Sequence, residues 1–246
     1  MGEMIAVWGS PGSGKTTVAL SLASALSERG TVSVLFCDGF CPALPAVFPK
    51  QKKYFSVGTA LSAVEITEDE IMRSANLYEN NGNMLFYGYA PGETVRSYPS
   101  FGGGRAADFL EKLSAVTDRT VIDCPSYLFS DPLSLAALRL SGGVVRLWSP
   151  DLRAPAYFQS VLKLLPEEKY RTGRHVRVLN LPDGEIPPPE RETEAAMSGR
   201  ESVFPHIKKL KGLFPEGGML SAEARRLTKR PAEKILSFCD AGRDKK

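Results

Sequence analysis

The segment that most constrains the fold lies near the amino end of the chain. Residues 9–16, Gly-Ser-Pro-Gly-Ser-Gly-Lys-Thr, fill the pattern G-x-x-x-x-G-K-[ST]. The apolar run 4–8 before them predicts a short buried strand. Residues 16–29 after them predict a helix that ends at Gly30, because Val18, Leu22 and Leu26 share one stripe. A strand, a glycine-rich turn and a helix N-terminus in this order form a cradle for phosphate groups.

The residue types of this phosphate loop (residues 9–16) match the chemistry of a bound polyphosphate. The N–H groups of the glycine-rich turn point inward, and the helix N-terminus adds roughly half a positive charge. Lys15 can reach the β- and γ-phosphates, and the Thr16 hydroxyl can bind Mg²⁺. A chance match is the alternative, and the flanking strand and helix argue against it. We predict that a nucleoside triphosphate is bound by Gly9, Ser10, Pro11, Gly12, Ser13, Gly14, Lys15, Thr16 and Thr17.

Length and composition fit a single α/β domain over residues 1–246. The chain is 43% hydrophobic and 24% charged, which is ordinary for a globular protein. It has neither an apolar run of about 20 residues nor a signal-peptide pattern, so we expect no integral membrane span and a cytoplasmic location. Cys37 and Cys41 could hold a metal in principle. With only two histidines in the chain, buried thiols are the favoured interpretation.

Strand and helix patterns alternate along the chain. This alternation predicts a mostly parallel central sheet covered on both faces, the three-layer α/β/α architecture of P-loop NTPases. Two long loops are expected, at about 39–56 and 181–190. The predicted strands are 4–8, 32–36, 84–89, 119–123, 144–148 and 176–180, and the predicted helices are 16–29, 58–65, 67–79, 103–117, 132–140, 154–165 and 221–239.

Two acidic residues follow predicted strands and could hold Mg²⁺ through its water shell. Asp123 closes the apolar strand 119–123, where an acid costs desolvation unless a cation lies nearby. Asp38 follows the strand 32–36 and could orient an attacking water or a Mg²⁺-bound water. The alternatives are a simple strand-end cap for Asp123 and an Asx turn into Gly39 for Asp38. We predict Lys15, Asp38 and Asp123 as catalytic residues, and Thr16, Asp38 and Asp123 as the magnesium site.

Positive charge is concentrated near the carboxyl end. Residues 206–246 contain 11 Lys/Arg against 5 Asp/Glu, whereas the whole chain has a net charge of only +3. Such a basic C-terminal segment indicates an anionic partner, either a membrane surface or DNA, although a solvated basic face without a partner is the favoured interpretation. Residues 207–214 could form a helix with one apolar face. Packing on the sheet is favoured over lipid contact there.

Several of these residues together resemble the MinD/ParA group of P-loop ATPases, which includes the CpaE/TadZ pilus-positioning proteins. The resemblance is carried by the phosphate loop, Asp38, Asp123-Cys124-Pro125 and the run 144–151, and it extends over nearly the whole chain. It implies an ATP-dependent dimer that hydrolyses ATP slowly and positions or assembles a larger apparatus, with ATP and Mg²⁺ as cofactors. A protein of that apparatus would be its partner, and it would work in the cytoplasm or peripherally at the inner face of the membrane.

The resemblance also assigns roles to individual residues. It implies that Lys15 and Thr16 bind phosphate and Mg²⁺, that Asp123 holds the magnesium water shell, and that Asp38 positions the hydrolytic water. It further places Asn180, Pro205 and the neighbouring His206 at the adenine.

Two departures from that pattern leave other functions open. Many members of the group carry an early lysine in the phosphate loop where this chain has Ser10, and a second acid where it has Phe40. Losing that cation weakens the stabilisation of transition-state charge. A nucleotide-dependent scaffold with little turnover is therefore an alternative. A relative of bacterial tyrosine autokinases is another, although the 76 residues after Tyr170 contain no tyrosine.

Overall fold

An eight-stranded sheet forms the centre of the computed structural model, which describes residues 2–78, 82–94, 96–181, 194–195, 197–213 and 217–241. The strand order is β3-β4-β2-β5-β1-β6-β7-β8, and every neighbouring pair is parallel except β3 with β4. The strands are β1 (Glu3–Gly9), β2 (Val32–Phe36), β3 (Asn76–Leu77), β4 (Met84–Tyr87), β5 (Arg119–Asp123), β6 (Gly143–Trp148), β7 (Val176–Asn180) and β8 (Ser202–Phe204).

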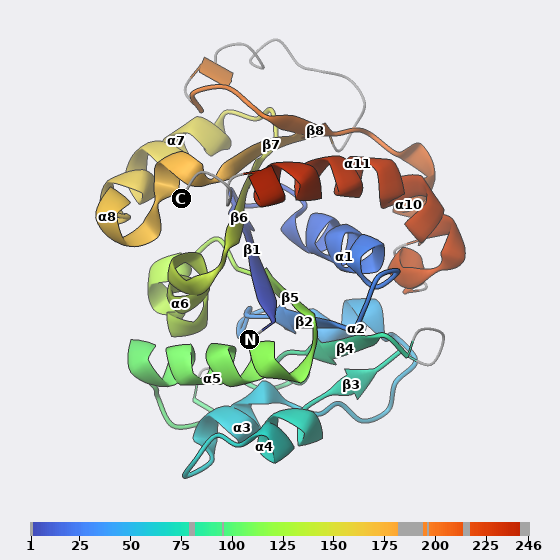
Figure 1. The fold of residues 1–246 in the computed structure, drawn as a ribbon, viewed down its shortest axis with the longest axis vertical. Coiled ribbons are helices and arrows are strands. Elements are labelled where there is room, and N and C mark those ends of the chain that lie inside the picture. The colour runs from blue at the N-terminus through green and yellow to red at the C-terminus, as the bar shows by residue number, and fades with distance from the viewer. Residues whose placement is uncertain are drawn as a thin grey trace.

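Helices cover both faces of this sheet (Figure 1). One face packs against α1 (Lys15–Leu26), α2 (Leu44–Val47), α10 (Lys208–Leu213) and α11 (Ala222–Ala241). The other packs against α3 (Val57–Ser62), α4 (Glu68–Arg73), α5 (Gly103–Val116), α6 (Pro132–Leu140), α7 (Arg153–Val161) and α8 (Glu167–Tyr170). Short 3₁₀ turns are η1 (Leu128–Ser130), η2 (Leu162–Leu164), η3 (Thr172–Arg174) and η5 (Gly218–Leu220).

The central strands are rich in apolar residues, and both of their faces are buried. Along β1, Met4, Ala6 and Trp8 belong to the core under α5 to α7, whereas Ile5 and Val7 belong to the core under α1 and α11. This alternation follows from the two-residue period of a strand. The three-layer α/β/α fold with a mostly parallel sheet is thus confirmed.

Most predicted elements are confirmed, and one is partly wrong. Residues 67–79 do not form one helix: α4 ends at Arg73, and residues 76–77 form the antiparallel edge strand β3. The side chain of Asn76 explains the break, because its amide donates to the carbonyls of Phe55 and Phe86 and fixes the chain beside β4. Strand β8 was not predicted from the sequence. At three residues it is too short to show a periodic pattern.

The structure adds detail to the two predicted long loops and to the basic C-terminal segment. The first loop contains α2, and of the second loop only Leu181 lies within the described residues. Within 207–213, Leu210 is buried in the core and Ile207 and Leu213 pack against it, so the apolar face of α10 points inward as favoured above. Phe214 lies outside the described residues. Among the helices described, none combines the length and apolar character needed to cross a bilayer.

Candidate phosphate-binding site

A cleft opens at the carboxyl ends of the adjacent strands β1, β5 and β2. Ligands of open α/β sheets bind at this edge. The cavity has a volume of about 710 Å³, and its wall includes the phosphate loop and both acids predicted above. Its lining residues are Pro11, Gly12, Gly14, Lys15, Thr16, Thr17, Asp38, Cys41, Pro42, Ala43, Ala46, Asp123, Cys124, Pro125, Ser126, Tyr127 and Tyr157.

The backbone of the phosphate loop takes the conformation that its glycines permit. Gly12 has φ 72° and Gly14 has φ 83°, both in the left-handed region that side chains disfavour. Gly14 precedes the first residue of α1, so the first N–H groups of this 12-residue helix face the cleft without partners in the helix. A side chain at Gly14 would also collide with Asn180, whose Nδ2 would lie 2.4 Å from the added Cβ. The result is an anion site built from backbone.

Lys15 is held across the mouth of this loop. Its Nζ donates to the carbonyl of Ser10 at 3.1 Å and to Oγ of Ser126 at 2.7 Å. Ser126 Oγ in turn donates to the carbonyl of Gly9 at 3.0 Å. Burial lowers the pKa of the Lys15 ammonium, and the nearby Asp123 opposes that shift. The ammonium group is therefore held in a fixed position at the mouth of the loop.

Thr16 and Asp123 form a hydrogen-bonded polar pair in the wall of the cleft. The Thr16 hydroxyl donates to Asp123 Oδ2 at 2.6 Å. Asp123 Oδ1 is buried and has no hydrogen-bond partner among the described residues. Burial raises the pKa of Asp123 to about 6, against the opposing effects of Thr16 and Lys15. A buried carboxylate oxygen with no partner, next to a threonine hydroxyl, matches the oxygen donors that Mg²⁺ and its water shell require.

Asp38 has one oxygen committed to the local turn. Its Oδ1 accepts from the backbone N–H of Phe40 at 2.9 Å and of Cys41 at 2.7 Å, which is the Asx turn considered above. The hydroxyl of Tyr127 donates to the same oxygen. The side chain nevertheless lines the cleft, so the turn fixes the carboxylate in place rather than removing it from the site.

Comparison with solved structures places this arrangement among known folds, whereas no family model and no curated protein matches the sequence. The ParA family ATPase from Chlorobium tepidum TLS superposes with a TM-score of 0.78 at 13% identity, over 97% of this chain and 99% of that chain. The chain has the MinD/ParA fold. The septum site-determining protein MinD with Mg-ADP from Pyrococcus horikoshii OT3 gives a TM-score of 0.71 at 17% identity, over 98% and 99% of the two chains. An ATP complex of a Cyanothece McdA variant gives 0.66 at 14%, over 98% of each chain.

Within this MinD/ParA fold, some predicted nucleotide ligands are not part of the cavity lining. Ser10 is completely buried, and its N–H donates to the carbonyl of Leu147 in β6. Asn180, at the end of β7, donates its amide to the carbonyl of Ser13 at 2.8 Å. Its side chain thus supports the phosphate loop through the backbone.

The remaining predicted ligands contribute no side-chain surface to the cavity lining. Gly9 and Ser13 are buried beneath the loop, and Ser13 Oγ donates to the carbonyl of Ser10. Pro205 and His206 follow β8, three strands from β1, with Pro205 exposed and His206 half-buried. The structure therefore brings together Pro11, Gly12, the residues 14–17, Asp38 and Asp123 in the cavity lining. The predicted ligands outside that lining are Gly9, Ser10, Ser13, Asn180, Pro205 and His206.

Several residues of the site were missed by sequence reasoning. Ser126, Tyr127 and Tyr157 line the cleft, and Tyr157 fixes the Ser126 carbonyl through a hydrogen bond of 2.7 Å. Arg153 begins α7, and one of its guanidinium nitrogens would lie 3.9 Å from a Cβ at Gly12. The position of Ser126 three residues after Asp123 was a usable signal. Arg153 could not be found in this way, because it is far from Gly12 in the sequence and no local motif marks it.

Proposed function

We propose that this chain is an ATP-binding switch of the MinD/ParA type, which hydrolyses ATP slowly and positions or assembles a larger apparatus. One observation carries the proposal: at the N-terminus of α1, the fixed Lys15 ammonium lies in the same cleft as the Thr16–Asp123 pair with its unpartnered buried oxygen. A cation, helix N–H groups and two oxygen donors together suit a triphosphate with its divalent ion.

Each residue of the cleft has a definable task in this proposal. The N–H groups at the start of α1 and Lys15 bind the phosphate oxygens and neutralise the charge that develops on them. Thr16 and Asp123 would hold Mg²⁺, which supplies charge neutralisation between the phosphates when bound. Asp38 orients the attacking water with Oδ2, since no described residue donates a hydrogen bond to that oxygen. We assign the adenine to Asn180, Pro205 and His206 on the resemblance to the family.

The charge around the phosphate loop supports slow turnover. Ser10 is buried and neutral at the position where many family members have a lysine, so that cation is absent from the loop. The guanidinium of Arg153 lies beside Gly12 and can supply part of the missing charge. The same observation on Ser10 favours the second candidate function, a nucleotide-dependent scaffold with little turnover. The tyrosine-kinase alternative is not supported by the described residues, because the last tyrosine of the chain, Tyr170, is buried.

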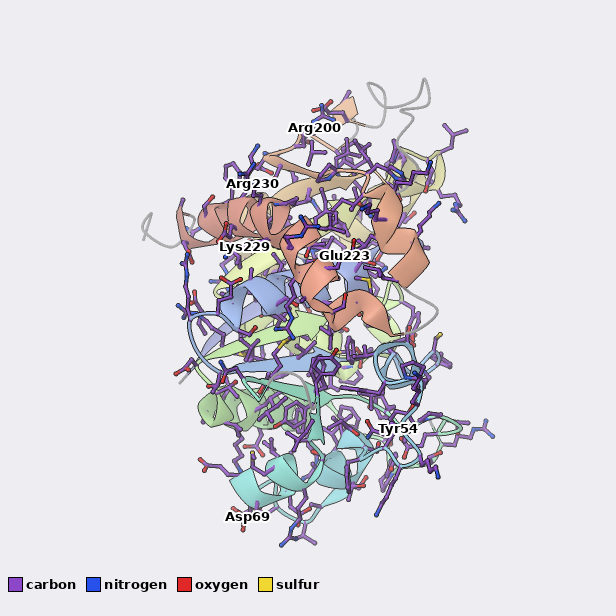
Figure 2. All side chains as sticks on the ribbon, turned by 90° about the vertical axis from the view of Figure 1, so that its right-hand side faces the viewer. Tyr54, Asp69, Arg200, Glu223, Lys229 and Arg230 are labelled. Atoms are coloured by element: carbon purple, nitrogen blue, oxygen red, sulfur yellow. The ribbon has the colours of Figure 1, made fainter. Side chains whose placement is uncertain are left out.

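A switch of this type needs a nucleotide-dependent state and a target. We propose an ATP-dependent homodimer as the active state and a protein of the larger assembly as its partner. The exposed basic side chains of α10 and α11 could add contact to an anionic membrane surface or DNA, with the protein in the cytoplasm or at the inner face of the membrane. Figure 2 shows Lys229 and Arg230 on one face of the molecule, together with the acidic Glu223. Lys229 pairs with Glu28 at 2.6 Å, which reduces the charge on that face.

The test of the switch is size-exclusion chromatography with Mg-ATP and with Mg-ADP. We expect a dimer of the wild type with ATP only, and a stronger ATP dimer for Asp38→Ala, because the variant lacks the oxygen that orients water. Asp69→Ala, an exposed acid on α4, is the matched control and should behave as the wild type. Identical elution of all three proteins in both nucleotides would refute the switch.

Phosphate release separates the ATPase from the scaffold. We expect a slow release by the wild type that Lys15→Ala abolishes, because the variant lacks the fixed ammonium of the loop. Equal and negligible rates for the two proteins, with ATP binding retained in the wild type, would favour the scaffold.

A further inference from the structure

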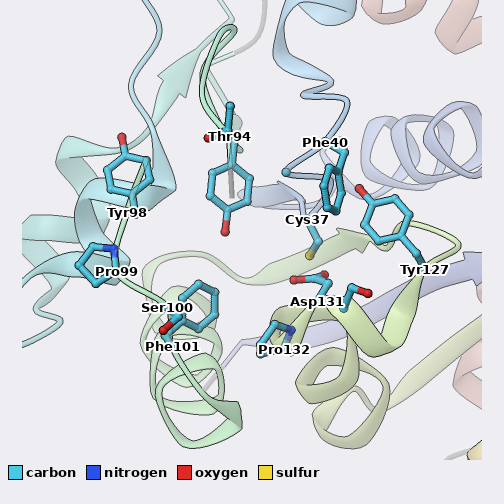
Figure 3. A pocket seen from close by; sticks show the side chains of 13 residues that line it. Cys37, Phe40, Thr94, Tyr98, Pro99, Ser100, Phe101, Tyr127, Asp131 and Pro132 are labelled. Atoms are coloured by element: carbon cyan, nitrogen blue, oxygen red, sulfur yellow. The ribbon is translucent and has the colours of Figure 1, made fainter. Parts of the chain in front are cut away.

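A second, smaller cavity lies next to the phosphate cleft and shares Tyr127 with it. It has a volume of about 240 Å³ and lies between the segments that follow β2, β4 and β5. Aromatic rings dominate its wall: Phe40, Tyr89, Tyr98, Phe101 and Tyr127. Figure 3 shows Phe40 and Tyr127 on one side, Tyr98 and Phe101 on the other, and Asp131 at the floor between them.

The floor of this aromatic cavity carries a negative charge without a basic counterpart. Asp131 is only 7% exposed, and no lysine, arginine or histidine is among the described lining residues. Its carboxylate accepts from the N–H groups of Leu133 and Ser134 and from the Ser134 hydroxyl, where it caps α6. A carboxylate offers about four acceptor sites and these bonds use three, so one acceptor site of this cavity-lining residue is unused.

The size and chemistry of the cavity define its occupant. Pockets for drug-sized ligands have about 300–1,000 Å³, so this cavity suits a single side chain or a comparably small group. Aromatic faces attract cations, and a guanidinium stacks on them while donating to a carboxylate. Tyr89 lies in the same negative environment. Burial is the larger cause that raises the pKa of its hydroxyl, and the charge of Asp131 is the next.

We propose that this aromatic cavity is a binding site for a cationic side chain, an arginine or lysine, presented by a partner protein. Phe40 is 64% exposed at the cavity, as expected for an aromatic residue that a partner covers. Charge complementarity selects the occupant, since the cavity combines a carboxylate with five rings. The class of partner is therefore a protein with an exposed basic residue on a protruding loop or helix.

The cavity is mechanically connected to the phosphate cleft. Asp38 Oδ1 accepts from the Tyr127 hydroxyl and from the N–H of Phe40, and the rings of Phe40 and Tyr127 pack edge to face with centroids 5.0 Å apart. One wall of the cavity is thus held by a carboxylate that lines the other site. We expect a nucleotide that displaces Asp38 to move this wall and change the affinity of the cavity. This coupling rests on the proposed function, whereas binding of the cation does not.

The test is an NMR titration of the full chain that follows the aromatic ring signals. The probes are N-acetyl-arginine methylamide, whose only charge is the guanidinium, and the neutral N-acetyl-norleucine methylamide. We expect saturable shifts with the arginine probe only. Asp131→Asn should weaken binding at least about tenfold, as expected for loss of a charged hydrogen bond. Asparagine is favoured at helix N-caps as aspartate is, and its one oxygen can keep the bonds from Ser134, so urea unfolding of this variant checks that the fold is kept. Phe40→Leu, an exposed position, should weaken binding as well.

Equal shifts with the two probes, or unchanged arginine binding in Asp131→Asn, would overturn the site. For the coupling, Mg-ATP should change the affinity for the arginine probe more in the wild type than in Tyr127→Phe, because the variant keeps the ring and loses one of the two links to Asp38 while the Phe40 N–H bond stays. An equal change in the two proteins would refute the coupling through Tyr127. The two proposals fail separately. A chain that binds no ATP in calorimetry refutes the switch, while cation binding is still measured without nucleotide.

Discussion

Arg153 at the start of α7 offers a quantitative test of how the phosphate cleft is charged. Its guanidinium lies beside Gly12, 3.9 Å from where a Cβ would be, and is 3.7 Å from the carboxylate of Asp151. The side chain is 76% exposed. Two unit charges 4 Å apart interact by about 1 kcal/mol in water and about 4 kcal/mol at an effective dielectric constant of 20. High exposure and competition from Asp151 favour the lower limit.

We therefore expect Arg153→Ala to weaken Mg-ATP binding by about 1 kcal/mol, which is roughly a fivefold rise in Kd. The effect should nearly vanish at about 1 M salt, where the Debye length is about 3 Å. Isothermal titration calorimetry at low and high salt measures both numbers. Arg153→Lys keeps the charge and should lose less affinity than the alanine variant.

The matched control is Arg226→Ala, an exposed arginine on α11 that does not line the cleft. Its affinity for Mg-ATP should equal that of the wild type at both salt concentrations. If Arg153→Ala binds Mg-ATP as tightly as the wild type at low salt, or if Arg226→Ala loses as much, the electrostatic reasoning is refuted.

Three further predictions concern the loop, the metal pair and the core. Gly14→Ala should lower the free energy of unfolding, measured in urea, by at least about 1 kcal/mol, because φ is 83° at this position. Adding Asn180→Ala should restore only the part of this loss that comes from the collision of the new Cβ with Asn180. The wild type should bind ATP more tightly with Mg²⁺ than with EDTA, and Thr16→Ala should show a smaller preference because only Asp123 of the pair remains; an unchanged preference would contradict the assignment. Burial lowers the pKa of His175 from 6.5 to about 4, with Trp8 donating to its Nδ1. As the pH falls, the histidine of the unfolded chain is protonated before the buried one. The contribution of His175 to the free energy of unfolding is therefore present above pH 6.5 and decreases by about 3 kcal/mol by pH 4. Urea unfolding of His175→Gln should lack that loss, and parallel pH profiles for the two proteins would refute it.

The sequence predicted the parts of the site that are local in the chain. The phosphate loop has its strand, turn and helix within residues 3–26, and Asp123 closes an apolar strand, so each carries its own signal. Asp38 was predicted with two interpretations, a catalytic acid and an Asx turn. The turn is present, and the catalytic role stays a prediction.

Contacts between distant segments were beyond sequence reasoning. The bond from Lys15 to Ser126 spans 111 residues and that from Tyr127 to Asp38 spans 89, so neither follows from spacing along the chain. The break after Arg73 was missed for a similar reason. The chain there is fixed by bonds from Asn76 to Phe55 and Phe86, which override the local helical pattern.

The two outer strands of the sheet are its shortest members. β3 has two residues and runs against its neighbour, and β8 has three. Edge strands this short expose few backbone groups to another chain, so edge-to-edge pairing of sheets between molecules is disfavoured. Association between copies of this protein is therefore favoured through side-chain surfaces, which leaves every strand of the sheet in place.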